Sequence, residues 1–209
     1  MQTYPKKWSR ITALLTLFGA LSLAGLAPAR AQQQTLPALD QKLYPLRARF
    51  NQDVGKVRLI VIVDPTCPPC RWGASEIQKQ VLEAIPSNRL AVYVVWIPVL
   101  NYQDEATLQR NGLKESSRVS DSRAIHYTDP YGFSGKQYST ILSFPYHAPA
   151  WDVYLVFGAE VRWEDRAPTP TDWMYQGQGF DRARLLDGRR LAEQVQRLLR
   201  ATDSKAAGR

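Results

Sequence analysis

The sequence has few of the sulfur and imidazole ligands that closed zinc sites use, with two cysteines and two histidines among its 209 residues. A closed zinc site needs four ligands of this kind, so Cys67, Cys70, His126 and His147 would all be required. Both histidines lie far along the chain from the cysteines, and neither belongs to a paired ligand motif. The spacing therefore gives no support for zinc. A copper site using Cys67, Cys70 and His147 is the more credible metal alternative, because two sulfurs and an imidazole suit copper.

A hydrophobic run long enough to span a membrane is also lacking near the N-terminus. Residues 11–26 form an apolar run of about 16 residues, where a spanning helix needs about 20. The run follows a basic segment at 6–10 and precedes Ala29-Arg30-Ala31, which has small residues where a signal peptidase reads them. We expect residues 1–31 to be a cleaved signal peptide, with a retained anchor as the alternative, and the protein to be extracytoplasmic, periplasmic or secreted. No cysteine lies near the expected cleavage site, so a lipid anchor of the usual bacterial kind is excluded.

The remaining chain lacks a strong excess of charge. The leader carries four basic and no acidic residues, so a net charge of +8 falls to +4 once it is removed. That charge is too small and too dispersed to indicate nucleic acid as a partner. There is no internal repeat, low-complexity segment or long linker, so we expect residues 32–209 to form a single domain.

What the chain does have is an apolar run that leads into a cysteine pair, VRLIVIVDPTCPPCRW at 57–72. The uniformly apolar Val57–Val63 predicts a central strand covered on both faces. Pro68 and Pro69 suit the first turn of a helix, where a missing N–H is least harmful. A buried strand would thus deliver Cys67 and Cys70 to the start of a helix.

The rest of the chain predicts an α/β domain with a mixed sheet. A helix at 70–85 between strands at 57–63 and 90–99 makes a βαβ unit, so these two strands should be parallel. The other expected helices lie at 39–50, with an interruption at Pro45 as an alternative, at 105–114, at 135–142 and from 187 onward. The other expected strands lie at 123–127, 153–157 and 161–163, the last two joined by a hairpin turn at 158–159.

The cysteine pair admits three interpretations: a structural disulfide, a metal site and a redox-active dithiol. Closing so short a loop stabilises a fold by only about 2 kcal/mol, so a structural staple would be better placed across a longer loop. A Cys-x-x-Cys at a helix start places the first sulfur beside free N–H groups and the positive end of the helix dipole. The sequence therefore favours a redox role, with Cys67 attacking a substrate disulfide and Cys70 resolving the mixed disulfide.

The two intervening prolines affect the acidity of Cys67. Neither Pro68 nor Pro69 can donate an N–H to its sulfur, so stabilisation of the thiolate should depend on the Cys70 N–H and on the dipole. We therefore expect a Cys67 pKa that is lowered, but not to the extreme of the strongest disulfide oxidants.

The strand VRLIVIV, the segment DPTCPPCRW, the following helix and the strand AVYVVWIPV resemble the thioredoxin-like superfamily. An extra helix and strand before IHYTDPYG are similar to the insertion of its TlpA-like and peroxiredoxin-like members. The resemblance covers about Leu46–Trp163, with the C-terminal helix beyond it. It implies a thioredoxin-like fold and a thiol–disulfide oxidoreductase with catalytic Cys67 and Cys70. It implies no cofactor. A Sco-like copper chaperone using Cys67, Cys70 and His147, and a redox-inert binding module, are the alternatives.

Two departures from the family pattern concern what surrounds the dithiol. The family usually has Trp before the first cysteine, where this chain has Thr66. Family members also place a cis-proline directly before the third core strand, where this chain has Asp152. Either Pro149 fills that role, or Trp151 and Asp152 face the sulfurs, and we favour the second. A nearby Asp152 would raise the pKa of Cys67.

The resemblance also implies partners. They would be disulfide-containing exported proteins, with a membrane thiol–disulfide electron donor as a further candidate.

Overall fold

The computed structural model describes residues 1–2, 35–101, 103–177 and 180–207. Residues 34–209 form one compact unit, which contains all the elements below. The predicted signal peptide at 1–31 lies almost wholly outside the described residues. Within the described part, no helix combines the length and the apolar character needed to cross a membrane.

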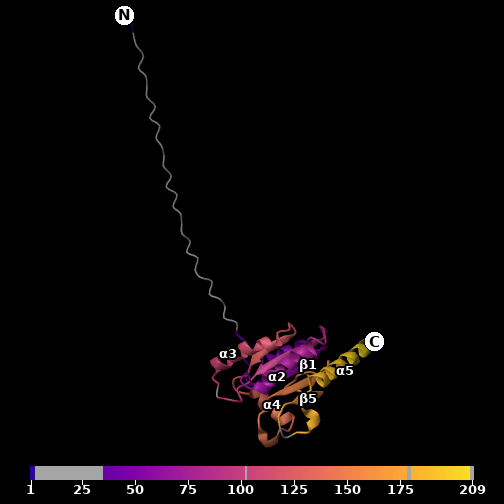
Figure 1. Ribbon diagram of the computed structural model, residues 1–209. Coiled ribbons are helices and arrows are strands. Elements are labelled where there is room, and N and C mark those ends of the chain that lie inside the picture. Colours follow the sequence, from indigo (N-terminus) through magenta and orange to yellow (C-terminus); the bar gives the residue numbers. More distant parts are fainter. Residues whose placement is uncertain (3–34, 102, 178–179, 208–209) are drawn as a thin grey trace. The chain divides into compact units, whose positions relative to one another are not determined.

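A five-stranded mixed sheet forms the centre of the fold (Figure 1). Its strand order is β3-β2-β1-β4-β5. β1 is parallel to β2, and β2 is parallel to β3, whereas β4 is antiparallel to both β1 and β5. The prediction of an α/β domain with a mixed sheet is confirmed. The strands are β1 (Val57–Val63), β2 (Leu90–Trp96), β3 (Ala124–Thr128), β4 (Val153–Phe157) and β5 (Asp172–Tyr175).

β1 is the central strand and has the bounds that the sequence predicts. All seven of its residues are buried, including Arg58, which donates to the backbone carbonyls of Phe50 and Gly158. An isolated charge would be costly there, and these hydrogen bonds together with the Phe50 ring under the guanidinium compensate for its burial. Because β1 pairs with a strand on each side, the chain that leaves it at Val63 emerges in the middle of the sheet, at the carboxyl end of β1.

Helices cover both faces of the sheet, and alternate residues of each strand pack into two apolar clusters. On one face lie α2 (Pro68–Glu76), its continuation as the π-helix η1 (Ile77–Leu82), α3 (Glu105–Ser116) and α5 (Gly188–Ala207). On the other lie α1 (Leu46–Gln52) and α4 (Phe133–Ile141). The short 3-10 helices are η2 (Ser117–Val119), η3 (Pro145–His147) and η4 (Arg182–Arg184).

The helix–strand insertion predicted between β2 and α4 is present as α3 and β3. Asp104 caps α3, accepting a hydrogen bond of 2.7 Å from the N–H of Thr107. The turn after β3 is closed by Asp129, whose carboxylate accepts from the N–H groups of Phe133 and Ser134 at the start of α4.

The helix expected at 39–50 is present only after Pro45, the residue at which an interruption was considered. α1 begins after Pro45, which follows a cis peptide bond, and Leu43 has a left-handed backbone with φ of 57°. Leu39, Leu43, Leu46 and Phe50 are nevertheless all buried, so their spacing indicated burial correctly but not a continuous helix. Proline cannot continue a preceding helix, because its ring clashes with the turn before it.

The prediction of a strand at 161–163 is wrong, because the strand that pairs with β4 there is β5 at Asp172–Tyr175. The backbone N–H and C=O of Trp163 are both bonded to the side-chain amide of Asn51, at 2.8 Å each, instead of to β4. The Trp163 ring packs against Phe50 and Tyr138. The chain rejoins the sheet at Thr171, whose N–H donates to Val156.

Candidate active site

The dithiol lies where β1 passes into α2, as predicted. Cys67 is the N-cap of α2, with Pro68 and Pro69 in the first turn, and its sulfur accepts a hydrogen bond of 3.2 Å from the N–H of Cys70. The Cys70 N–H is thus the donor expected from the two prolines. Both cysteines are free thiols, and their side chains are 1% and 0% exposed.

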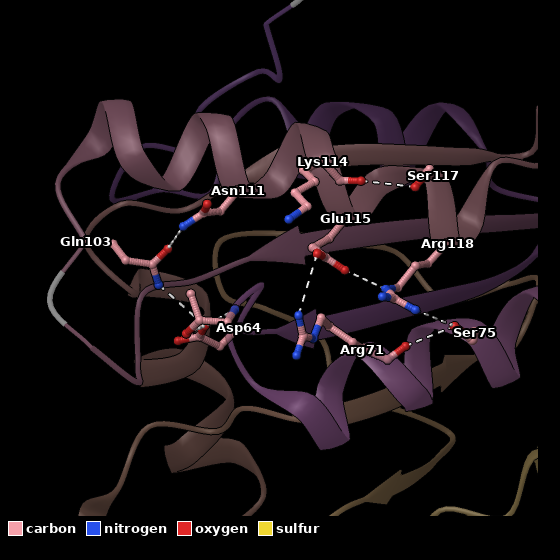
Figure 2. Close-up of polar contacts among 10 residues, drawn as sticks. Asp64, Arg71, Ser75, Gln103, Asn111, Lys114, Glu115, Ser117 and Arg118 are labelled. Carbon is pink, nitrogen blue, oxygen red and sulfur yellow. Dashed lines mark hydrogen bonds and ion pairs between the residues drawn. The ribbon is translucent and has the colours of Figure 1, made fainter.

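Asp64 shapes the segment between β1 and Cys67. Its Oδ1 accepts from the N–H and hydroxyl of Thr66, both at 2.7 Å, and its Oδ2 accepts from the N–H groups of Val99 and Leu100, at 2.8 and 2.7 Å. The amide of Gln103 also lies 3.4 Å from Oδ1 (Figure 2). One buried carboxylate therefore holds together the ends of β1 and β2 directly before the cysteine pair.

A charged cluster joins the outer side of α2 to α3. Glu115 on α3 is buried and pairs with Arg118 and, at 3.9 Å, with Arg71, the residue after Cys70 (Figure 2). Arg118 also reaches Ser75 on α2 at 3.4 Å. These contacts fix the first two turns of α2 against the insertion.

Asp152 faces the dithiol from the residue before β4. One of its carboxylate oxygens and the sulfurs of Cys67 and Cys70 all lie within 4.8 Å of one another. The side chain is 2% exposed, and the backbone is left-handed with φ of 54°. The position that holds a cis-proline in the family thus holds an acid, which the thiol of Cys70 is close enough to hydrogen-bond.

Tyr154, which is buried, and Gln176, which is half-buried, complete a polar network around Asp152. Oδ1 of Asp152 accepts from the hydroxyl of Tyr154 at 2.7 Å and from the side-chain amide of Gln176 at 2.9 Å. The same amide lies 3.0 Å from the carbonyl oxygen of Pro69. Tyr154 could have been found from the sequence, because residues two apart in a strand share a face. Gln176 gave no such signal.

Gly73 makes room for this network. A Cβ added to Gly73 would lie 1.8 Å from the hydroxyl oxygen of Tyr154 and 2.7 Å from the amide nitrogen of Gln176. Glycine in the interior of a helix costs about 1 kcal/mol relative to alanine. Its presence in α2 is therefore explained by the close approach of Tyr154.

The prediction of a lowered Cys67 pKa is wrong. Burial raises the pKa of the Cys67 thiol, and the negative charges of Asp152 and Asp64 raise it further, whereas the Cys70 hydrogen bond lowers it by less. Burial and Asp152 also raise the pKa of Cys70. Burial raises the pKa of Asp152 itself, opposed by its hydrogen bonds to Tyr154, Gln176 and Cys70.

The other loop residues considered for the site lie around Asp152. Trp151 is half-buried and packs against the cluster that contains both cysteines. Among the peptide bonds that the structure describes, the cis bond precedes Pro45, so the bond before Pro149 is trans. Pro149 lines a groove of about 440 Å³ together with Phe144, Pro145, Tyr146, Ala148, Trp151, Tyr175, Gln176 and Gly177.

The histidines do not join the cysteines. In the described ranges, the group of three possible metal ligands is Cys67, Cys70 and Asp152, without a histidine. His147 is exposed, and His126 stacks on Trp96 and bonds the carbonyl of Val119. The copper site with His147 is therefore not formed. A divalent ion bound by two thiolates and the carboxylate would leave a net negative charge in the interior, which is costly.

A scan of the sequence against protein-family models finds no match, and a search of curated proteins finds none. Among solved structures, a secreted Mycobacterium tuberculosis disulfide oxidoreductase homologous to E. coli DsbE is 11% identical, over 69% of this chain and 84% of that one, with a TM-score of 0.44. MTB dsbF is 13% identical over 71% and 84%, with a TM-score of 0.45. A yeast mitochondrial 1-Cys peroxiredoxin is 8% identical over 76% and 70%, with a TM-score of 0.40.

The strand order and directions of this chain, with the dithiol at the end of the central parallel strand, decide the fold. It is thioredoxin-like. The thioredoxin-like sheet positions Cys67 and Cys70 from β1 and α2, and Asp152 and Tyr154 from β4. The sequence resemblance predicted this fold.

Proposed function

We propose that the protein is an extracytoplasmic thiol–disulfide oxidoreductase that reduces or exchanges disulfides in exported proteins. The observation that carries the proposal is the convergence of two free thiols and a buried carboxyl group within 4.8 Å. A structural disulfide needs no acid beside it, whereas a cycling dithiol needs an acceptor for the proton of its second thiol.

In the proposed cycle, Cys67 loses its proton to solvent and attacks one sulfur of a substrate disulfide. A mixed disulfide forms, and the first substrate thiolate leaves and is protonated by water. The Cys70 thiol then passes its proton to Asp152, and its sulfur attacks the Cys67 sulfur. The second substrate thiolate leaves, and the protein retains a Cys67–Cys70 disulfide, having donated two electrons.

The electrostatics of the site support a reductant in preference to an oxidant. Strong disulfide oxidants owe their potential to a stabilised thiolate in the reduced form. Here burial and Asp152 destabilise both thiolates and raise both thiol pKa values, which favours the disulfide form. We expect a reduction potential below about −200 mV, and a value near −120 mV would contradict this direction.

The groove lined by Trp151 and Gln176, both of which adjoin Asp152, suggests how a substrate lies. Its walls are largely aromatic and proline side chains, and Trp151 and Gln176 connect it to Asp152. An extended segment of an exported protein would fit there with its disulfide at Cys67. A membrane thiol–disulfide donor would return electrons to the oxidised protein.

Insulin reduction by dithiothreitol provides the first test. The wild-type protein should accelerate it, Cys67→Ser should abolish the acceleration, and Cys70→Ser should accumulate mixed disulfides with substrate. Ser204→Ala, whose exposed hydroxyl donates to the carbonyl of Arg200 within α5, is the control and should retain activity. Equal rates with and without wild-type protein would overturn the proposal, and copper retained by the wild type but lost in Cys67→Ser would favour the chaperone alternative.

Localisation has its own test. The N-terminus of protein recovered from the periplasmic fraction should be Gln32, and protein found only in the cytoplasm with an intact leader would contradict the proposal.

A further inference from the structure

Gln176 occupies an unusual place relative to the dithiol, just beyond the end of β5. Its backbone N–H donates to the carbonyl of Asp152 at 2.9 Å, which continues the β4–β5 pairing by one residue. Its side-chain nitrogen lies 2.9 Å from Oδ1 of Asp152, 3.1 Å from the hydroxyl of Tyr154 and 3.0 Å from the carbonyl of Pro69. An amide nitrogen has two hydrogens, so these three acceptors share two donors.

The direction of these hydrogen bonds matters for the carboxylate. Tyr154 and Gln176 both donate to Oδ1 of Asp152, so the other oxygen keeps its lone pairs for a further donor. Donors on a carboxylate favour its ionised form. The same amide holds the carbonyl of Pro69, the residue before Cys70. Gln176 thus contacts both the proton acceptor and the turn that carries the proton donor.

We propose that Gln176 is a positioning residue for the resolving step, orienting Asp152 to receive the proton of Cys70 and holding the Cys-Pro-Pro-Cys turn in place. This inference rests on the proposed function. Gln176 exchanges no proton and no electron itself. It acts through Asp152, so its loss should change the pH range over which Cys70 reacts and leave the attack of Cys67 unaffected.

Dithiobis(nitrobenzoate) separates the two steps in one experiment. Cys67 attacks the reagent, one coloured thiolate leaves, and a mixed disulfide forms. Cys70 then attacks the Cys67 sulfur, its proton goes to Asp152, and a second coloured thiolate leaves. Stopped-flow absorbance therefore shows two phases, and the second reports resolution. Its rate should fall with falling pH as Asp152 becomes protonated.

In Gln176→Leu the acid limb of the second phase should move to higher pH by about one unit, which is about a tenfold loss of rate on that limb. Gln176→Glu should move it in the same direction, because a second carboxyl group disfavours ionisation of Asp152. That variant keeps the size of the side chain, so the test stands if the leucine variant is loosely folded. The first phase should be unchanged in Gln176→Leu, which adds no charge beside Cys67.

Gln137→Leu is the matched control, since Gln137 lies on α4 and its amide contacts the carbonyl of Gln41. It should leave both phases unchanged. A second phase slowed equally at every pH, with an unmoved acid limb, would overturn the inference. A wild-type protein that releases no second thiolate would instead overturn the proposed function.

Discussion

The hydroxyl oxygen of Tyr154 lies 1.8 Å from the point where a side chain on Gly73 would begin. A strand of the sheet and the helix that carries the cysteines therefore meet at a position where only glycine fits. Because Tyr154 also donates to Asp152, this contact links the packing of α2 to the polar network behind the dithiol.

Gly73→Ala should lower the free energy of unfolding by about 1–3 kcal/mol, because the new methyl group overpacks a buried site. Alanine is the better helix former by about 1 kcal/mol, which offsets part of the loss. Urea unfolding measures the net effect. Combining Gly73→Ala with Tyr154→Phe should recover part of it, since the clashing oxygen is then absent. A fully additive pair would show that the two residues do not compete for this space.

Asp152→Asn should stabilise the protein at pH 7 by about 1 kcal/mol and slow the resolving step about a hundredfold. The native pKa of Asp152 is raised by burial, so the unfolded chain releases this proton at lower pH than the native protein does. Native stability is therefore lost as pH rises from about 4 toward the native pKa, and asparagine removes that loss. Urea unfolding at pH 7 and pH 4 tests it, because the gain should disappear at the lower pH.

The reduced protein should lose stability as pH rises above about 8.5. Native Cys67 and Cys70 have raised pKa values, so above the ordinary thiol pKa the unfolded chain has released protons that the native protein still holds. The free energy of unfolding should fall by about 1–2 kcal/mol between pH 8 and 9.5, as measured by urea unfolding in excess reductant. The Cys67→Ser, Cys70→Ser double variant should lack this slope, and an equal slope in both proteins would contradict the assignment.

Asp64→Asn should destabilise the fold by about 2 kcal/mol, because an amide nitrogen cannot accept the hydrogen bonds that one carboxylate oxygen accepts. Either the Thr66 donors or the N–H groups of Val99 and Leu100 would lose their acceptor. Asp104→Asn is the matched control, since asparagine caps a helix as well as aspartate does. Thermal unfolding of both variants makes the comparison, and equal midpoints would contradict the role of Asp64.

The sequence predicted those parts of the fold that depend on continuous apolar runs. β1 and β4 have the expected bounds because every residue in them is buried, and burial is visible in composition. The last strand was missed because its place depends on a distant side chain, Asn51, which binds the backbone of Trp163 in the segment expected to pair. No local pattern indicates a contact between residues so far apart.

In the site, too, the features that depend on neighbouring residues were predicted, and those that depend on distant residues were missed. The Cys70 N–H donor to Cys67 follows from two prolines and a helix start, and it is present. The direction of the Cys67 pKa was missed, because burial by the rest of the fold outweighs the local hydrogen bond. The carboxyl group of Asp152 was considered, but the amide of Gln176 that fixes it directly follows a strand, β5, whose position the sequence did not reveal.

The left-handed backbone at Asp152 limits how the cis-proline of the thioredoxin-like superfamily could be introduced at this position. Proline is restricted to φ near −65°, whereas residue 152 has φ of 54°. Exchanging Asp152 for proline would therefore require the loop before β4 to take another path, and the Gln176 N–H would lose the carbonyl it now contacts. An acid and a proline at position 152 therefore require different backbone conformations. A variant with proline there would need the whole loop from 148 to 152 to be replaced.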